Sequence, residues 1–292
     1  MMQTELSIAA SDQQQAADSS IGGLLLECGK ITPDNAERVL RLQKELGIRF
    51  GEAAQRMGLI DDADIQQVLA RQFDYPYLQP GAGACSPHLV AAYDPFSPQV
   101  EVLRAVRSQL MLRWFGRGRK SLTVVGIHSG DGASLFAANL AVVFSQLGEH
   151  TLLVDANLRR PAQQAIFGLP GRQGLSDVLA GRAELDIVAQ VEPFSDLSVL
   201  SAGTLPPNPQ ELLARSSFTG LNAQLEARYD VLLYDVAASA SGLDALVLAA
   251  RTGGVLIVAR KNKTHLAEVQ ALAGQVAQNG AVVVGSVLVD FP

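Results

Sequence analysis

The segment 128–134 has the residue types and spacing of a loop that binds phosphate. Gly130 and Gly132 let the backbone turn its N–H groups inward, and the helical pattern directly behind them adds the partial positive charge of a helix N-terminus. In a complete loop of this kind a Lys reaches the phosphates, and a following Ser or Thr hydroxyl binds Mg²⁺. Here the hydroxyl is present as Ser134, but the position before it is Ala133. The sequence predicts a phosphate loop without its lysine, with a simple strand-to-helix turn as the alternative.

Two aspartates stand at the ends of apolar runs. Asp155 follows the run 151–154, and Asp235 follows a run that begins at Tyr229. Ligands of open parallel sheets bind at the carboxyl ends of the strands, and carboxylate, hydroxyl and phosphate oxygens suit Mg²⁺. We therefore expect a Mg²⁺ site formed by Asp155, Asp235 and Ser134. The alternative is that each Asp only caps the helix that follows it.

An alternation of apolar runs and helical patterns indicates the fold that carries these residues. Helical patterns at 210–228 and 266–278 separate the later apolar runs. This order is typical of a parallel sheet with helices on both faces, so the sequence predicts an α/β domain over residues 99–292. The expected strands are 122–127, 151–154, 197–200, 229–233, 254–259 and 282–289.

Five stretches carry a resemblance to a known family, namely 137–148, 152–155, 206–213, 258–264 and 285–288. Over residues 99–291 the chain resembles the bacterial tyrosine kinases of polysaccharide export, in particular the stand-alone kinases of the EpsG type that control chain length at exopolysaccharide loci. The resemblance implies a deviant P-loop NTPase fold of the MinD-like type. It also implies a family that phosphorylates tyrosine with ATP and Mg²⁺.

The resemblance assigns roles to residues of this sequence. Asp155 and Asp235 become the catalytic pair, with Asp155 placed to take the tyrosine proton, and Ser134 completes the Mg²⁺ coordination. Arg260 lies in a basic loop that can approach the nucleotide base, with a solvated charge cluster as the alternative. The residues expected to contact ATP or ADP are Ser129, Gly130, Asp131, Gly132, Ala133, Ser134, Leu135 and Arg260.

The family also carries Glu-x-x-Arg-x-x-Arg on the helix before the first strand, where it helps to assemble a ring of subunits. Glu101, Arg104 and Arg107 reproduce this pattern. Spacings of three and six place the three residues near one helix face, from which they can reach a neighbouring copy. We expect a homo-oligomeric ring formed through these residues, with a solvated helix face as the alternative.

The chain departs from the family at three active-site positions. The family has Lys, or often Arg in the exopolysaccharide subgroup, in place of Ala133, a second Asp in place of Asn157, and commonly Thr-Pro-Pro in place of 236–238. No other Lys lies in the loop, and loss of one preorganised donor costs roughly 10²- to 10³-fold in rate. Two functions stay open: a tyrosine kinase with impaired catalysis, and a catalytically weak regulatory subunit that binds nucleotide and a Wzz-like membrane chain-length determinant.

The first third of the chain contains an internal repeat, because the pattern of 20–43 recurs in 49–72. Each copy has a short helical segment that ends at a Gly, then a capping turn and a second helical segment, so 20–78 should form a small all-α domain. It resembles the N-terminal domain of type II secretion ATPases and its cyclic-di-GMP-binding variant. We favour a docking module without nucleotide, because the motif's opening Arg is Ser20 in the first copy. A cyclic-di-GMP site would use Gly22, Gly29, Gln43, Arg49, Gly51, Gly58 and Gln72.

Composition bounds the remaining possibilities. The chain has 292 residues, of which 48% are hydrophobic and 18% charged, and this suits two globular domains. A net charge of −6 argues against nucleic-acid binding. No apolar run is long enough for a membrane span, so we expect a cytoplasmic protein that is peripheral to the membrane. We expect a disordered tail at 1–19 and a linker at 79–98.

Overall fold

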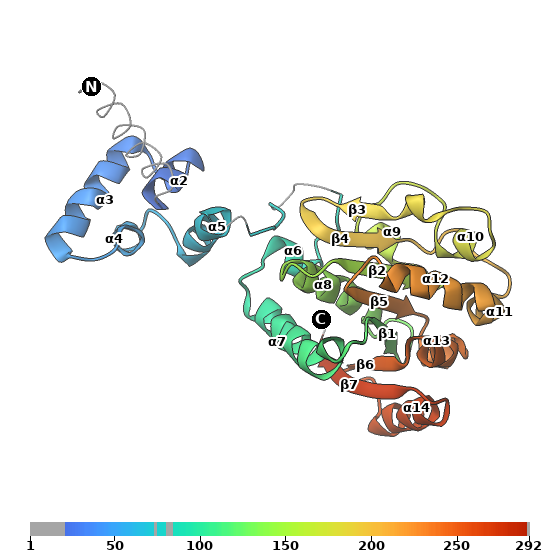
Figure 1. Ribbon diagram of the computed structural model, residues 1–292. Helices are drawn as coiled ribbons and strands as arrows, with labels where there is room; N and C mark the ends of the chain where they lie inside the picture. Colours follow the sequence, from blue (N-terminus) through green and yellow to red (C-terminus); the bar gives the residue numbers. More distant parts are fainter. Residues whose placement is uncertain (1–20, 73–74, 80–83, 291–292) are drawn as a thin grey trace. The chain divides into compact units, whose positions relative to one another are not determined.

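A computed structural model describes residues 21–72, 75–79 and 84–290 of the chain (Figure 1). The chain divides into two compact units, Met1–Pro76 and Tyr77–Pro292. The tail expected at 1–19 lies outside the described residues. None of the described helices combines the length and the apolar character that crossing a bilayer requires.

Each copy of the sequence repeat in the first unit forms a short helix and then a longer one. The short helices are followed by Gly29 and Gly58, whose φ angles of 66° and 67° lie in the left-handed region that glycine adopts without strain. Thr32 caps the first long helix, because its side chain accepts the Asn35 N–H. The helices are α2 (Ile21–Glu27), α3 (Pro33–Leu46), α4 (Phe50–Arg56) and α5 (Asp62–Gln72).

The four helices described for residues 21–72 close on a small apolar core, and two glycines of the repeat let them approach. A Cβ atom at Gly22 would lie 3.2 Å from the Phe50 ring, and one at Gly51 would lie 3.1 Å from the Ile65 side chain. Helix packing therefore accounts for both glycines. The buried side chains are Leu25, Ile31, Ala36, Val39, Ala53, Ala54, Ile60 and Val68.

The second unit is built on a seven-stranded sheet with the strand order β3-β4-β2-β5-β1-β6-β7. Neighbouring strands are parallel except for β3 and β4, which confirms the predicted parallel-sheet α/β fold. The short antiparallel edge strand β3 (Ala189–Val191) has no counterpart among the predicted strands. The other strands are β1 (Ser121–Gly126), β2 (Thr151–Ala156), β4 (Phe194–Leu200), β5 (Val231–Val236), β6 (Gly254–Arg260) and β7 (Val282–Val289).

Helices cover both faces of this sheet, because successive residues of each strand point to opposite sides (Figure 1). Val124 and Leu233 face one apolar layer, and Val125 and Tyr234 face the other. The first layer contains residues of α6 (Val90–Tyr93), α7 (Pro98–Arg113) and α8 (Ala133–Ser145), and α9 (Gln163–Ile166) adjoins it. The second contains residues of α10 (Leu175–Leu179), α11 (Pro209–Ala214), α12 (Ser216–Glu226), α13 (Asp244–Thr252) and α14 (Leu266–Gln278).

The segment 79–98, which the sequence predicts to be a linker, differs from that expectation in its described part. Ala91 and Ala92 in α6 are fully buried, and the Ala91 N–H donates to Oδ1 of Asn139 on α8 at 2.8 Å. Small side chains indicate a linker by composition, but here they let α6 approach α8. Residues 84–98 are therefore part of the second unit.

The helix predicted at 210–228 is interrupted at Arg215, which separates α11 from α12. Arg215 has an extended backbone, with φ of −60° and ψ of 151°. Arg251 on α13 donates to the Ala214 carbonyl at 2.6 Å and to Thr219 Oγ1 at 2.7 Å. The guanidinium thus binds the end of α11 and the beginning of α12, a contact that no local sequence pattern reports.

Candidate functional site

The loop between β1 and α8 depends on two glycines in left-handed conformations. Gly130 and Gly132 have φ angles of 91° and 83°, which other residues rarely adopt. Gly132 is the N-cap of α8, and no side chain caps this helix. The first N–H groups of a helix have no partner within it. The loop therefore presents a helix N-terminus in the arrangement that favours an anion.

Asp131 fixes the shape of this loop. Its side chain is buried, and its Oδ2 accepts the His128 N–H at 2.8 Å. Thr264, in the turn after β6, donates its hydroxyl to the same oxygen at 3.3 Å. Asp131 was predicted as a nucleotide contact, and in this structure both of these bonds are internal to the protein.

Two guanidinium groups border the loop, one from the end of β6 and one from the turn after β2. Arg260, at the end of β6, donates to the Gly130 carbonyl at 3.0 Å. Arg160, in the turn after β2, donates to Ser129 Oγ at 3.3 Å. Positive charge therefore remains at the loop although it has no lysine. The sequence predicts Arg260 but not Arg160, because only the sheet brings the turn after β2 to this loop.

Strands β2 and β5 bring the two predicted carboxylates side by side. Asp155 and Asp235 are register partners on neighbouring parallel strands, and both are fully buried. Burial raises the pKa of each carboxyl above its ordinary value, and the Asp155 charge raises the pKa of Asp235 further. Two buried carboxylates so close together repel each other, and a cation between them would relieve that repulsion.

Asp155 binds backbone groups through both oxygens. Oδ1 accepts the Asn157 N–H at 3.2 Å, and Oδ2 accepts the N–H groups of Ala162 and Gln163, both at 2.9 Å. These bonds hold the start of α9, so the helix-capping alternative applies to this Asp. A carboxylate has about four acceptor sites, which leaves room for a metal as well.

Asp235 accepts a hydrogen bond from Gln163 through one of its two oxygens. Its Oδ2 accepts the Nε2 of Gln163 at 2.7 Å, and the same nitrogen donates to the Ser134 carbonyl at 3.0 Å. Oδ1 of Asp235 and Oε1 of Gln163 are buried, and no described residue donates a hydrogen bond to either. Unpartnered buried acceptors are rare in folded proteins. In this position they fit a cation or the water bound to it.

The donors at these strand ends fit Mg²⁺. In the part of the chain that the structure describes, no group of three or more His, Cys, Asp and Glu side chains could hold a metal. Mg²⁺, however, is usually held by one or two carboxylates together with phosphate oxygens and water. Ser134, in the first turn of α8, is close enough to hydrogen-bond Asp235 and oppose the rise in its pKa that burial causes. Asp155 and Ser134 therefore both lie next to Asp235, and binding of Mg²⁺ by the three residues stays a prediction.

A cavity of about 480 Å³ lies beside the loop. Arg260 and Lys263 give it positive charge, and His128 Nε2 lies 3.1 Å from Glu268 Oε1 at its wall. The predicted nucleotide contacts divide into residues that line this cavity and residues that do not. Those that line the cavity are Ser129, Gly130, Asp131 and Arg260, and those that do not are Gly132, Ala133, Ser134 and Leu135.

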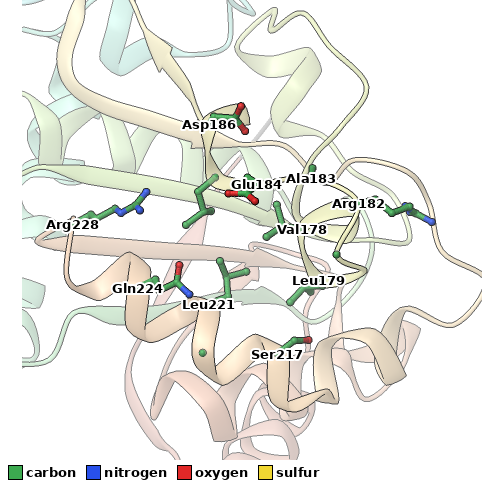
Figure 2. A pocket seen from close by; sticks show the side chains of 13 residues that line it. Val178, Leu179, Arg182, Ala183, Glu184, Asp186, Ser217, Leu221, Gln224 and Arg228 are labelled. Carbon is green, nitrogen blue, oxygen red and sulfur yellow. The ribbon is translucent and has the colours of Figure 1, made fainter.

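A larger cavity, of about 1070 Å³, lies between the α10 region and α12 and contains none of the predicted site residues (Figure 2). Leu179 and Leu221 contribute apolar surface to it, and Arg182 is bound to the Asp177 carboxylate at 2.9 Å. Its charged lining residues are Arg182, Glu184, Asp186 and Arg228. Because charges of both signs surround apolar side chains, this lining does not specify one kind of ligand.

The three residues of the predicted ring motif do not form a free row on α7. Arg104 pairs with Glu101, and its guanidinium lies 5.9 Å from the centre of the Phe96 ring. Arg107 donates to the Val143 carbonyl on α8 at 2.6 Å, so it binds within the protein. The Glu101 side chain is 63% exposed. Contact with a neighbouring copy through this face stays a prediction.

Two residues near the site, Gln163 and Arg160, were not predicted from the sequence. Gln163 connects both carboxylates and α8, yet it lies eight residues after Asp155 and 72 before Asp235. Arg160 follows Arg159, which is bound to Asp244 of α13. The pair of arginines after a strand-end Asp is visible in the sequence, but which of them turns to the loop depends on α13.

A glycine-bent loop before a helix, with carboxylates at neighbouring strand ends, defines a P-loop nucleotide-binding domain. Residues 119–278 match the family model described as cellulose biosynthesis protein BcsQ. The solved structure of the septum site-determining protein MinD from Pyrococcus horikoshii shares the fold, with a TM-score of 0.50 and 22% identity over 58% of this chain and 70% of that chain.

Other relatives are closer in sequence. The putative tyrosine-protein kinase CapB of Staphylococcus aureus is 33% identical over 198 residues, which are 68% of this chain and 87% of the relative. The tyrosine-protein kinase Wzc of Salmonella typhi is 32% identical over 200 residues, but the match spans only 28% of that relative. The crystal structure of the chimerical protein CapA2B2 covers 77% of this chain and 97% of its own, with 32% identity and a TM-score of 0.66. The chain belongs to the bacterial tyrosine kinases known as the BY-kinase family.

Proposed function

We propose that this chain is a tyrosine-kinase-like P-loop ATPase that regulates exopolysaccharide chain length or export, and that Ala133 impairs its catalysis. One observation carries the proposal: Asp155 and Asp235 lie side by side, with one Asp235 oxygen unpartnered, next to a phosphate loop that has lost its basic residue. A relative named putative tyrosine-protein kinase EpsB, from Ralstonia, supports it at 33% identity.

Nucleotide and Mg²⁺ would bind where the loop meets the two carboxylates. The N–H groups at the start of α8 would hold the phosphates, and Ser134, Asp155 and Asp235 would hold the metal. When bound, Mg²⁺ supplies positive charge at the phosphate oxygens. Asp155 would accept the tyrosine proton. The MinD structure is titled as a complex with Mg-ADP, which supports this choice of ligand.

Impaired catalysis follows from what the missing side chain would do. A Lys at this position neutralises charge on the phosphates during transfer, and the Ala133 methyl group has no donor. Arg160 and Arg260 keep positive charge nearby, but both are hydrogen-bonded to the loop itself. We infer that nucleotide binding persists while phosphoryl transfer is slow.

Restoring the lysine tests this directly. We expect Ala133→Lys to raise the rate of ATP hydrolysis and of phosphotyrosine formation by roughly 10²- to 10³-fold, because a preorganised donor is worth that much. Both rates are measured in the full chain with Mg²⁺, with and without the substitution. Adding Asp235→Asn to the lysine variant is the control and should remove the gain. If the parent chain already has the same rates as the lysine variant, the proposal that Ala133 impairs catalysis is wrong.

A second candidate function is a catalytically weak regulatory subunit that responds to ATP or cyclic-di-GMP. The residues at 133, 157 and 236–238 favour it, because each departs from an active kinase. Such a subunit would dock on a Wzz-like membrane chain-length determinant and assemble as a homo-oligomeric ring, which would place it in the cytoplasm at the inner face of the membrane. If Ala133→Lys creates no transferase activity while nucleotide still binds, this function is preferred.

A further inference from the structure

A fully buried amide side chain joins three parts of the proposed Mg²⁺ site. Gln163 Nε2 donates to Asp235 Oδ2 at 2.7 Å and to the Ser134 carbonyl at 3.0 Å. Its backbone N–H donates to Asp155 Oδ2 at 2.9 Å. One residue therefore contacts the ends of β2 and β5 and the first turn of α8.

Local structure leaves this residue little freedom. Pro161 stands just before α9, and the Asp155 carboxylate binds the N–H groups of both Ala162 and Gln163. The backbone of Gln163 is thereby fixed at the start of α9. Its side chain is fully buried, and its two donor bonds hold the amide with Oε1 free of any described donor.

We propose that Gln163 is a positioning residue for Mg²⁺, fixing Asp235 so that one carboxylate oxygen is held by the protein and the other is left for the metal. The inference rests on the proposed function, because it concerns the same Mg²⁺ site. Asp235 Oδ1 and Gln163 Oε1, both without a described donor, are the acceptors available to Mg²⁺ or its bound water. The neighbouring loop has no lysine that could hold this carboxylate instead.

The expected loss of Mg²⁺ affinity can be estimated from other proteins in which one residue orients a metal ligand. Groups that orient a metal ligand typically change metal affinity by about 10- to 100-fold when they are removed. Gln163→Leu removes the donor and nearly keeps the volume, so Asp235 would lose its bond at Oδ2 and its fixed orientation. Gln163→Leu would also remove the bond to the Ser134 carbonyl in the first turn of α8, but it would leave the hydrogen bonds that shape the loop at 128–132 in place, because these come from Asp131, Arg160 and Arg260.

The test compares Gln163→Leu with Gln164→Leu in the full chain. Gln164 is the matched control, an exposed neighbour whose amide binds only the carbonyls of Leu169 and Gly171. Calorimetry measures ADP affinity in EDTA and at a series of Mg²⁺ concentrations. We expect Gln163→Leu to raise the half-saturating Mg²⁺ concentration about 10- to 100-fold and to leave the affinity in EDTA unchanged, with the control like the parent.

Each outcome decides between the inference and the function on which it rests. An equal Mg²⁺ requirement in Gln163→Leu and the parent overturns the positioning role alone, as does an equal loss of affinity with and without Mg²⁺. ADP binding by the parent that ignores Mg²⁺ also overturns it and leaves a nucleotide site. If the parent binds no ADP at all, the proposed function is wrong, and the inference about Gln163 is wrong as well. Should Gln163→Leu not fold, Gln163→Met, of the same length and without a donor, gives the same comparison.

Discussion

At the scale of single residues, the two buried carboxylates cost stability in the absence of a cation. Burial raises the pKa of Asp155 and of Asp235 above the ordinary value, which means that the folded chain binds these protons more tightly than the unfolded chain does. Stability from such a pair is present at low pH and is lost as the pH rises through the folded-state pKa values. Ionisation of the buried pair is therefore expected to lower the stability of the metal-free protein.

The pH dependence of stability tests this account. In EDTA and without nucleotide, we expect the free energy of unfolding to fall as the pH rises above about 4, the ordinary Asp pKa, toward neutrality, because both carboxylates must ionise in a buried position. Asp235→Asn should flatten this fall, since it removes one of the two charges. Urea denaturation at a series of pH values measures it.

An exposed acid provides the control for that series. Asp230 lies near His150 and Lys120 with its side chain 49% exposed, so Asp230→Asn should leave the slope between acidic and neutral pH nearly as in the parent. An unchanged slope in Asp235→Asn would show that the buried pair does not govern the pH dependence.

At the scale of elements, Arg107 joins α7 to α8. Its guanidinium binds the Val143 carbonyl, which belongs to the last turn of α8, where carbonyls lack partners within the helix. A cation at this end also interacts favourably with the helix dipole. A residue that the family pattern assigns to subunit contact therefore has a structural use inside this chain.

This contact gives a prediction about stability. Arg107→Leu should lower the free energy of unfolding by about 1–3 kcal/mol, the cost of leaving a buried partner unsatisfied. Glu101→Gln, on the exposed side of the same helix, should change it by less than about 0.5 kcal/mol. Equilibrium urea denaturation of the parent chain and the two variants measures these differences. Equal stability of all three would contradict the role of Arg107 in joining α7 to α8.

At the scale of the whole molecule, the family resemblance predicts assembly into a ring. The ring would use the exposed Glu101 on α7, so Glu101→Lys should reduce the assembled fraction seen by sedimentation velocity with Mg-ATP. Glu184→Lys, in the cavity between the α10 region and α12, is the control and should sediment as the parent does. If the parent chain stays monomeric under these conditions, the prediction of a ring is wrong.

The first unit gives a second prediction at this scale. Its Gly22 and Gly51 are accounted for by helix packing, and the opening Arg of the repeat motif is present once, as Arg49, because the first copy has Ser20, outside the described residues. We therefore expect calorimetry of the full chain with cyclic-di-GMP to detect no binding at tens of micromolar. If the parent chain binds cyclic-di-GMP and the Arg49→Ala variant does not, the docking-module interpretation is contradicted.

The parallel sheet and the positions of Ser134, Asp155 and Asp235 could be predicted because their signals are local. A β-branched run, a pair of glycines and an Asp at the end of an apolar strand each occupy a few neighbouring residues. The carboxyl ends of parallel strands then meet at one edge, so Asp155 and Asp235 lie at the same edge, and the strand order makes them neighbours.

The features of the fold and of the candidate site that the sequence did not predict depend on contacts between distant parts of the chain. The sequence by itself determined the phosphate loop, its missing lysine and the acidic strand ends. Only the tertiary structure decided that Gln163 reaches across 72 residues to Asp235, that Arg160 turns to the loop, and that α6 packs on α8 instead of forming a linker. The physical reason is that each of these depends on which side chain fills a space between elements, and that space exists only after the sheet and helices have packed.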